Sequence, residues 1–292
     1  MKSFREKIST QIRLSNTLQR LLILNVALFV LIRVINSVST LFLNPVLSFG
    51  DVSNYLAIRS NISEFILRPW TIFTYMFFHW DFMHLLFNML WLYWMGKIFQ
   101  EYLGNKKLLN TYIVGGLAGA LFFVAAYNIF PVFSDSVGAA FALGASASVL
   151  AITIATATLL PEYPIQLIFF GTIPLKWIAL VSILLDLISV SGSNAGGHIA
   201  HLGGALYGFI YIKQLKKGKD ISAWLTKFFD LFAPRKKMKV TYRQKKPDVS
   251  FNVNKKARQE KMDEILDKIS KSGYGSLSQE EKDFLFTMSK EN

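Results

Sequence analysis

Apolar residues gather into long blocks between residues 21 and 212, and short polar segments separate the blocks. Six blocks have the length or apolarity of membrane helices, at about residues 21–38, 82–99, 108–127, 146–160, 177–190 and 201–212. Crossing a bilayer takes roughly 20 apolar residues, so the last three blocks are short. Short blocks with polar first residues are expected where helices end in a water-filled cavity. The pattern predicts an all-α membrane protein built as a six-transmembrane-helix bundle.

Composition indicates the same class. The 292 residues are 52% hydrophobic and 14% aromatic, with a mean hydropathy of +0.35, which exceeds the usage of ordinary soluble domains. The chain has no cysteine, which excludes disulfides, thiol catalysis and thiolate metal sites.

Basic residues indicate the orientation. Residues 1–20 carry five lysines and arginines and residues 213–292 carry twenty, whereas residues 39–80 carry two and residues 129–143 carry none. By the positive-inside rule we expect both termini in the cytoplasm, and the residue usage favours a bacterial plasma (inner) membrane. The net charge of +13 then reflects topology and attraction to anionic lipid headgroups, and we expect no nucleic-acid partner.

The chain divides near residue 214. Residues 1–20 are predicted as a cytoplasmic N-terminus, residues 21–214 as the six-helix membrane domain, and residues 215–292 as a basic cytoplasmic tail. The tail begins with a predicted interfacial helix at residues 221–233, whose apolar face consists of Trp224, Leu225, Phe228 and Phe232. A patch for lipid headgroups follows at Arg235, Lys236 and Lys237.

Two polar helices complete the tail. They are predicted at residues 255–272 and 278–289, on either side of a turn that contains Gly273. Ser278 and Glu281 have the spacing of a capping box, in which each side chain accepts a hydrogen bond from the other residue's backbone N–H. We interpret this part as a solvated helical hairpin without catalytic activity.

All four histidines fall in two short motifs where apolar blocks begin, as His79, His84, His198 and His201. Histidine is costly in hydrocarbon, so this clustering indicates a functional site. Between the two motifs, Ser146 begins the fourth apolar block. A serine and histidines at the mouths of membrane helices favour a hydrolase inside the bilayer.

The second, fourth and sixth predicted helices run in the same direction, so the motif residues at their outer ends are expected in one layer. Ser146 would attack as a nucleophile, and His201 would take and return its proton. His84, Asn88 and the backbone N–H of Ser146 would stabilise the oxyanion, because the first N–H groups of a helix are unpaired and favour negative charge. The sequence does not fix how far Asp186 lies from His201, so a Ser-His dyad is the simpler prediction. We expect no cofactor and no metal.

Other polar residues near these motifs have structural interpretations. Ser148 points about 200° away from Ser146 on a helix and is interpreted as a packing hydroxyl. His79 and His198 are interpreted as residues that order loops, with His198 in the loop before the sixth helix. Arg33, inside the first helix, is interpreted as snorkelling or paired.

The base reaches the nucleophile only if the fourth and sixth helices pack closely. The fourth helix carries Ala147, Ala151 and Ala155 at a spacing of four residues, and the sixth carries Gly204 and Gly208 at the same spacing. Small residues every fourth position let helix backbones approach closely in membranes. We therefore predict that the alanine stripe faces the glycine pair.

These residues resemble the signature of the rhomboid intramembrane serine proteases. Three motifs within residues 20–213 carry the resemblance: H-x4-H-x3-N at His79, His84 and Asn88, G-x-S ending at Ser146, and H-x2-G-x3-G beginning at His201. The resemblance implies a six-helix fold, hydrolysis of peptide bonds in or beside transmembrane segments of protein substrates, and no cofactor. It also implies a dyad of Ser146 and His201, with His84 and Asn88 as the oxyanion site.

Three positions depart from the family pattern. Ala147 replaces the glycine that often follows the nucleophile, Leu150 replaces an aromatic residue that stacks on the histidine, and Thr71 follows Trp70 where the family has arginine. The change at Leu150 bears on turnover rather than on mechanism.

Two other functions remain open. A catalytically inactive rhomboid-like protein that binds membrane clients would lack Ser146 or His201, and both are present. A channel or transporter would line a path through the bilayer with polar residues, whereas the motif residues here gather at the outer ends of their helices.

Overall fold

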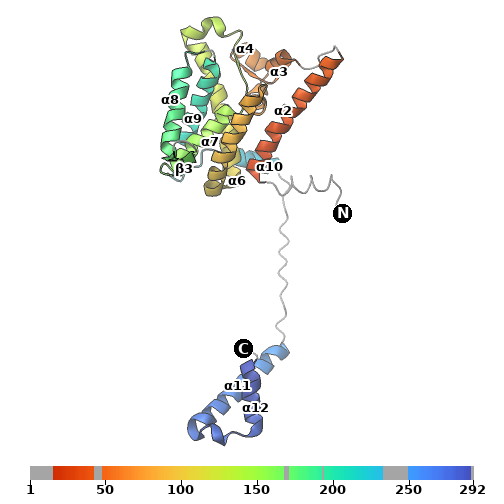
Figure 1. The fold of residues 1–292 in the computed structure, drawn as a ribbon, viewed down its shortest axis with the longest axis vertical. Helices are drawn as coiled ribbons and strands as arrows, with labels where there is room; N and C mark the ends of the chain where they lie inside the picture. Colours follow the sequence, from red (N-terminus) through yellow and green to blue (C-terminus); the bar gives the residue numbers. More distant parts are fainter. Residues whose placement is uncertain (1–15, 43–47, 168–170, 193, 233–248, 291–292) are drawn as a thin grey trace. The chain divides into compact units, whose positions relative to one another are not determined.

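The computed structural model describes residues 16–42, 48–167, 171–192, 194–232 and 249–290 (Figure 1). Its longer helices are α2 (Thr17–Leu41), α6 (Phe82–Ile129), α7 (Ser146–Leu159), α8 (Leu175–Ser189), α9 (Ala195–Leu215), α10 (Ala223–Phe232), α11 (Val249–Ser272) and α12 (Gln279–Lys290). Its shorter elements are α3 (Phe49–Tyr55), β1 (Ile58–Arg59), α4 (Ile62–Leu67), α5 (Thr71–Thr74), η1 (Tyr75–Phe77), η2 (Pro131–Ser136), β2 (Phe141–Ala142), β3 (Pro164–Leu167), β4 (Gly171–Pro174) and η3 (Tyr274–Ser276). The strands form two antiparallel pairs, β1 with β2 and β3 with β4.

Five of these helices contain the six predicted apolar blocks. α2, α7 and α8 each cover one block, with ends that differ from the prediction by a few residues. α6 is 48 residues long and covers two blocks, which meet at Gly104, where φ is 81° and ψ is 173°. Glycine adopts a positive φ without a steric penalty, so the backbone changes direction there within a single residue.

The predicted start of the sixth helix was wrong, because α9 begins at Ala195 and not at residue 201. In the structure Gly196 lies against the ring of Phe123, and a Cβ at Gly196 would lie 2.6 Å from Cε2 of that ring. The glycine therefore serves helix packing, and His198 is a helical residue rather than a loop residue.

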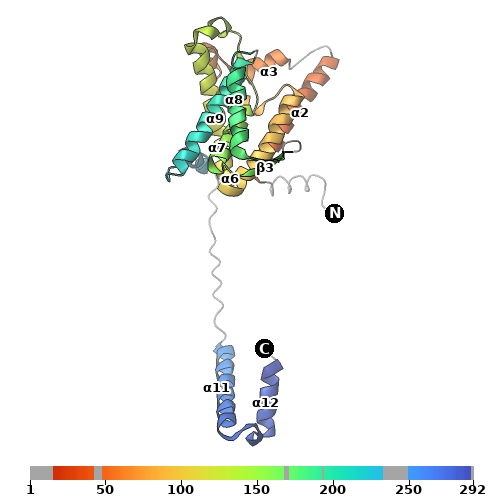
Figure 2. The ribbon, with the colours of Figure 1, turned by 60° about the vertical axis from the view of Figure 1, so that its left-hand side comes forward.

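Among the described residues, α2 and α6 are long and apolar enough to cross a membrane, and α7 is a shorter apolar helix. Every residue of α7 from Ala147 to Ala157 is buried, and α7 packs against α6, α8 and α9 (Figures 1 and 2). Thr153 and Thr156 donate hydrogen bonds of 2.8 and 2.7 Å to carbonyl oxygens four residues earlier. With its polar groups paired and no lipid face, α7 needs only 14 residues.

α2 is joined to α6 by a buried polar contact. Nδ2 of Asn25 lies 3.2 Å from the hydroxyl of Tyr112, which donates a hydrogen bond of 2.7 Å to the carbonyl oxygen of Met76. Near the other end of α2, the guanidinium of Arg33 lies 4.9 Å from the ring centroid of Trp80. Arg33, interpreted as snorkelling or paired, therefore lies against an aromatic ring.

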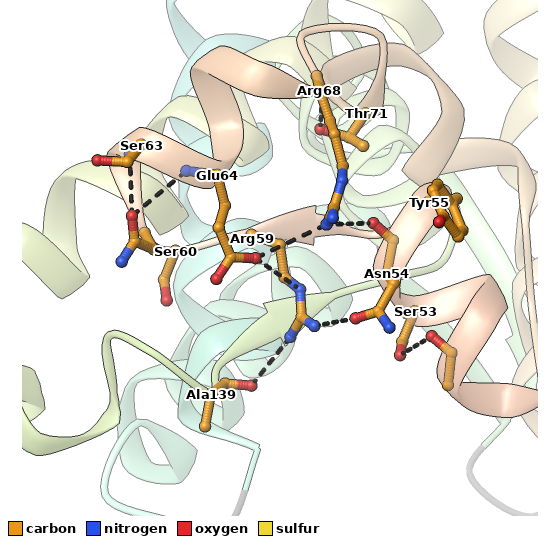
Figure 3. A network of polar contacts seen from close by, with 12 residues as sticks. Ser53, Asn54, Tyr55, Arg59, Ser60, Ser63, Glu64, Arg68, Thr71 and Ala139 are labelled. Atoms are coloured by element: carbon orange, nitrogen blue, oxygen red, sulfur yellow. Dashed lines mark hydrogen bonds and ion pairs between the residues drawn. The ribbon is translucent and has the colours of Figure 1, made fainter.

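An ion-pair network orders the segment between α3 and α5 (Figure 3). The carboxylate of Glu64 lies 3.4 Å from Arg59 and 3.8 Å from Arg68. Arg59 also bonds the side chain of Asn54, and its Nη1 donates a 3.4 Å hydrogen bond to the carbonyl oxygen of Ala139. Together with the β1–β2 pair, these contacts hold the segment that leads into α7.

Contacts divide the chain into two compact units, Met1–Ala233 and Pro234–Asn292. The division falls later than the predicted boundary at residue 214, because α10 packs on α6. Nδ2 of Asn110 donates hydrogen bonds of 2.7 Å to Thr226 Oγ1 and 3.2 Å to the carbonyl oxygen of Ser222.

The predicted apolar face of α10 is partly buried in the core and partly exposed. Leu225 is only 3% exposed and belongs to the core, whereas Trp224 and Phe228 are 53% and 50% exposed. The placement of Leu225 on a lipid-facing surface was therefore wrong. The basic patch at residues 235–237 and the side chain of Phe232 lie outside what the structure describes.

The second unit is a helical hairpin of α11 and α12 (Figure 2). The hairpin was predicted, but α11 begins at Val249 and not at residue 255. Gly273 turns the chain with φ of 76°. The capping box is confirmed, because the N–H of Ser278 donates to Glu281 Oε2 at 2.7 Å and the N–H of Glu281 donates to Ser278 Oγ at 3.3 Å. Lys268 Nζ also lies 2.9 Å from each carboxylate oxygen of Glu281 and joins the two helices.

Candidate active site

Ser146 is the first residue of α7 and follows a backbone turn at Gly144. The φ of Gly144 is 127°, a conformation that residues with side chains rarely adopt, and its N–H donates a 2.9 Å hydrogen bond to the carbonyl oxygen of Tyr75. A Cβ at Gly144 would lie 2.6 Å from Cε1 of His84. Glycine is required here by both the backbone and the available space, and the turn places the N-terminus of α7 beside His84.

Ser146, His84 and His201 line one cavity of about 420 Å³, although they come from α7, α6 and α9. Much of the remaining wall is formed by Tyr75, Trp80, Asp81, Asn194 and residues 141–144. Within the described part of the chain, the Ser146 hydroxyl makes no hydrogen bond with the His201 ring. Nucleophile and base often tighten into hydrogen-bond contact only when substrate is bound.

The distance between α7 and α9 is set by glycines. A Cβ at Gly204 would lie 2.1 Å from the carbonyl oxygen of Ala147, and a Cβ at Gly208 would lie 2.2 Å from that of Ala151. Any side chain at either glycine would collide with backbone. The two helices therefore touch where Gly204 meets Ala147 and where Gly208 meets Ala151. The first of these contacts lies one residue after Ser146 on α7 and three residues after His201 on α9.

His79 is fully buried just before α6 and binds the segment that leads into α7. Its Nε2 accepts the backbone N–H of Ala145 at 3.2 Å and lies 3.1 Å from Nδ2 of Asn88. Burial, with a smaller contribution from the neighbouring His84, lowers the pKa of His79 to about 3. The ring is neutral at physiological pH, and its Nε2 acts as an acceptor. The interpretation that His79 bonds loop backbone is confirmed.

Asn88 is 7% exposed and faces His79, and it is absent from the cavity lining formed by the described residues. Of the groups predicted to stabilise the oxyanion, His84 and the N-terminus of α7 line the cavity. An oxyanion role for Asn88 stays a prediction.

Ser148 is fully buried, away from the cavity lining described here. Its Oγ lies 3.9 Å from the sulfur of Met76, and a Cβ at Gly116 would lie 2.6 Å from the same oxygen. The hydroxyl packs between α6 and α7, as the sequence interpretation expects.

Asp186 was not assigned a role from sequence. It lies on the face of α8 that meets α9, and its Oδ1 is 2.8 Å from Nδ1 of His201 and 2.8 Å from Nδ1 of His198. The sequence contained one signal for this contact, an ionisable residue inside an apolar block, but the spacing did not identify its partner.

One possible metal-ligand atom from each of Asp186, His198 and His201 lies within 4.8 Å of the other two, a spacing that suits a metal ion. The same atoms are already paired as hydrogen bonds, because each ring nitrogen lies 2.8 Å from the carboxylate oxygen. We therefore interpret the group as a hydrogen-bonded cluster.

Two family profiles match the chain. The family profile described as Rhomboid domain matches residues 67–217. A second profile, described as a family of unknown function (DUF6576), matches residues 247–291. The chain therefore belongs to the rhomboid family, which includes serine intramembrane proteases, and family membership together with the apolar helices identifies it as a membrane protein.

Two relatives illustrate the extent of the similarity. RHOMBOID-like protein 12, mitochondrial, from Arabidopsis thaliana is 31% identical over 162 residues, which are 52% of this chain and 48% of that protein. Rhomboid protease GlpG from Salmonella choleraesuis (strain SC-B67) is 40% identical over 48 residues, which are 16% of this chain and 17% of that protein. The chain thus spans about half the length of the first relative and a smaller share of the second.

Proposed function

We propose that this protein is an intramembrane serine endopeptidase that cleaves peptide bonds in or next to transmembrane segments of membrane proteins. The observation that carries the proposal is the shared cavity of Ser146, His84 and His201. Hydrolysis of a peptide bond needs a nucleophile, a base and donors for the oxyanion, and these three residues with the N-terminus of α7 supply each of them.

In this proposal Ser146 Oγ attacks the carbonyl carbon of the substrate and passes its proton to Nε2 of His201. His201 then protonates the departing amine, and water hydrolyses the acyl-enzyme by the same route in reverse. His84 and the backbone N–H of Ser146 stabilise the oxyanion, since the first N–H groups of a helix favour negative charge. No step draws on a cofactor.

The same proposal includes six membrane spans, a cytoplasmic tail, and a location in a bacterial plasma membrane with both termini cytoplasmic. The spans rest on the six apolar blocks, the orientation rests on the distribution of lysine and arginine, and the bacterial location rests on residue usage. The chain has no cysteine, so single cysteines at Ser134, Ser191 and Lys219 report sidedness without background. We expect a membrane-impermeant maleimide to label the first two from outside intact cells and the third only after the cells are opened.

Anionic lipid headgroups are the proposed partner of α10. Trp224 and Phe228 are exposed on it, and the basic residues 235–237 follow in the sequence. Apolar insertion next to positive charge binds anionic surfaces and weakens with salt. Trp224→Ser should reduce binding of the chain's cytoplasmic segment to anionic vesicles, and equal binding by wild type and variant would contradict the proposal.

The protease function is tested by cleavage of a reporter transmembrane protein in liposomes. Wild type should cleave the reporter, Ser146→Ala should not, and Ser148→Ala is the matched control because it removes a buried hydroxyl two residues away. A wild type that binds the reporter without cleaving it would favour the inactive client-binding protein instead.

A further inference from the structure

Asp186 is a buried, ionisable residue in the largely apolar α8. Among the described residues it is the only buried carboxylate, at 7% exposed, while its neighbours Leu185 and Leu187 are exposed. An ionisable side chain within an apolar helix is costly unless polar partners compensate it, and such residues usually mark function. The partners of Asp186 are therefore informative.

Both partners come from α9. His198 and His201 are three residues apart and lie on one helix face, with ring centroids 5.7 Å apart. Each presents Nδ1 to the same Oδ1 of Asp186 at 2.8 Å. The contact thus uses the nitrogen of His201 that the proposed proton transfer from Ser146 leaves free.

The geometry points to Asp186 as a positioning residue for His201. This inference rests on the proposed function. A neutral imidazole carries its proton on one nitrogen and accepts with the other, and a carboxylate on Nδ1 holds the proton there. Nε2 of His201 is then the acceptor for the Ser146 hydroxyl proton, and the resulting imidazolium is stabilised by the carboxylate. Asp186 keeps its charge and forms no bond with substrate.

His198 supports the same carboxylate. One carboxylate oxygen accepts two hydrogen bonds, so both rings are able to donate to Oδ1 at once. Residues of four helices meet at this place: Asp186 on α8 and His198 on α9 contact the His201 ring, and His84 on α6 and Ser146 on α7 line the same cavity as His201. Since His198 acts on Asp186 and not on substrate, its loss should cost less than the loss of Asp186.

The test combines cleavage rates with ring tautomers. The chain has only four histidines, so a long-range ¹H–¹⁵N spectrum of ¹⁵N-histidine-labelled protein in detergent resolves few rings, and His→Gln variants assign them. The wild-type ring of His201 should carry its proton on Nδ1. Asp186→Asn, whose amide is able to donate to Nδ1, should move the proton toward Nε2 and lower cleavage on the order of 100- to 10,000-fold. Measurements in EDTA exclude a metal effect.

Asp186→Glu should recover part of the activity, because it restores a carboxylate, and Asp135→Asn is the control for loss of an exposed aspartate. Full cleavage by Asp186→Asn, or a wild-type His201 protonated on Nε2, would overturn the inference. The tautomer does not depend on turnover. A wild type that cleaves nothing would therefore reject the proposed function, while the spectra still decide whether Asp186 positions His201.

Discussion

The carbonyl oxygen of Ala147 occupies the space that a side chain at Gly204 would need, because a Cβ there would lie only 2.1 Å away. This contact lies next to the proposed nucleophile and one helical turn from the proposed base. The relation between Ser146 and His201 is thus fixed by backbone packing of α7 against α9 rather than by a hydrogen bond between the two side chains.

Enlarging Gly204 should separate the two helices without changing a catalytic atom. Gly204→Ala should lower the free energy of unfolding by about 1–3 kcal/mol or more, since overpacking forces backbone shifts, and Gly204→Val should lose more. Thermal unfolding in detergent measures the loss. Gly138→Ala is the control, because no atom lies within 4 Å of a Cβ at Gly138. A stable, active Gly204→Val protein would show that the helices do not meet there.

His201→Ala should be as damaging as Ser146→Ala, and the double variant should be no worse, because nucleophile and base act as one unit. Initial rates of reporter cleavage measure the comparison. Additive losses in the double variant would contradict a shared step.

Asn88 should act through one of two routes that a double-mutant cycle separates. Asn88→Ala should slow cleavage on the order of 10- to 1000-fold if Asn88 stabilises the oxyanion, and its effect should then add to that of His79→Ala. If Asn88 instead supports His79, which binds the N–H of Ala145, the double variant should be no slower than the worse single variant. An Asn88→Ala protein with wild-type rate would exclude both routes.

The buried His79 makes stability depend on pH. The unfolded ring takes up a proton near pH 6.5, whereas burial lowers the folded pKa to about 3, so acid favours the unfolded state. The contribution of His79 is complete above about pH 6.5 and falls as the pH drops toward 3, by roughly 2 kcal/mol at pH 5. His79→Gln retains an acceptor that does not titrate, and its unfolding free energy should therefore change less between pH 7 and pH 5. Parallel curves for the two proteins would contradict the assignment.

Truncation should destabilise the membrane unit only if it removes α10. Truncation after Phe232 keeps α10 and should leave cleavage and thermal stability largely intact. Truncation after Lys216 removes the partners of Asn110, which is 3% exposed, and should destabilise the protein. Inactivity of a folded protein truncated after Phe232 would show that the α11–α12 hairpin controls the site.

The sequence predicted the parts of the site that carry a local signature. Ser146, His84 and His201 each begin or nearly begin an apolar block, and their shared polarity in an apolar context identified them. The stripe of Ala147 and Ala151 likewise matched the spacing of Gly204 and Gly208. These patterns are readable because helical periodicity determines which residues share a face.

Contacts made between elements could not be read in this way. The carboxylate of Asp186 belongs to α8 and its histidine partners to α9, so no spacing within one segment joins them. Leu225 and Phe228 are equally apolar, and only the position of α6 buries the first and exposes the second. The start of α9 was missed because Gly196 fits against Phe123, a requirement that depends on the neighbouring helix.

The most direct measurement of the central claim is the site of covalent labelling by a serine-directed phosphonate, mapped by mass spectrometry in wild type, Ser148→Ala and His201→Ala. We expect the label on Ser146 in wild type and in Ser148→Ala, and greatly slowed labelling in His201→Ala because the base is missing. Labelling at Ser148, or Ser146 labelling that proceeds equally well without His201, would contradict the account.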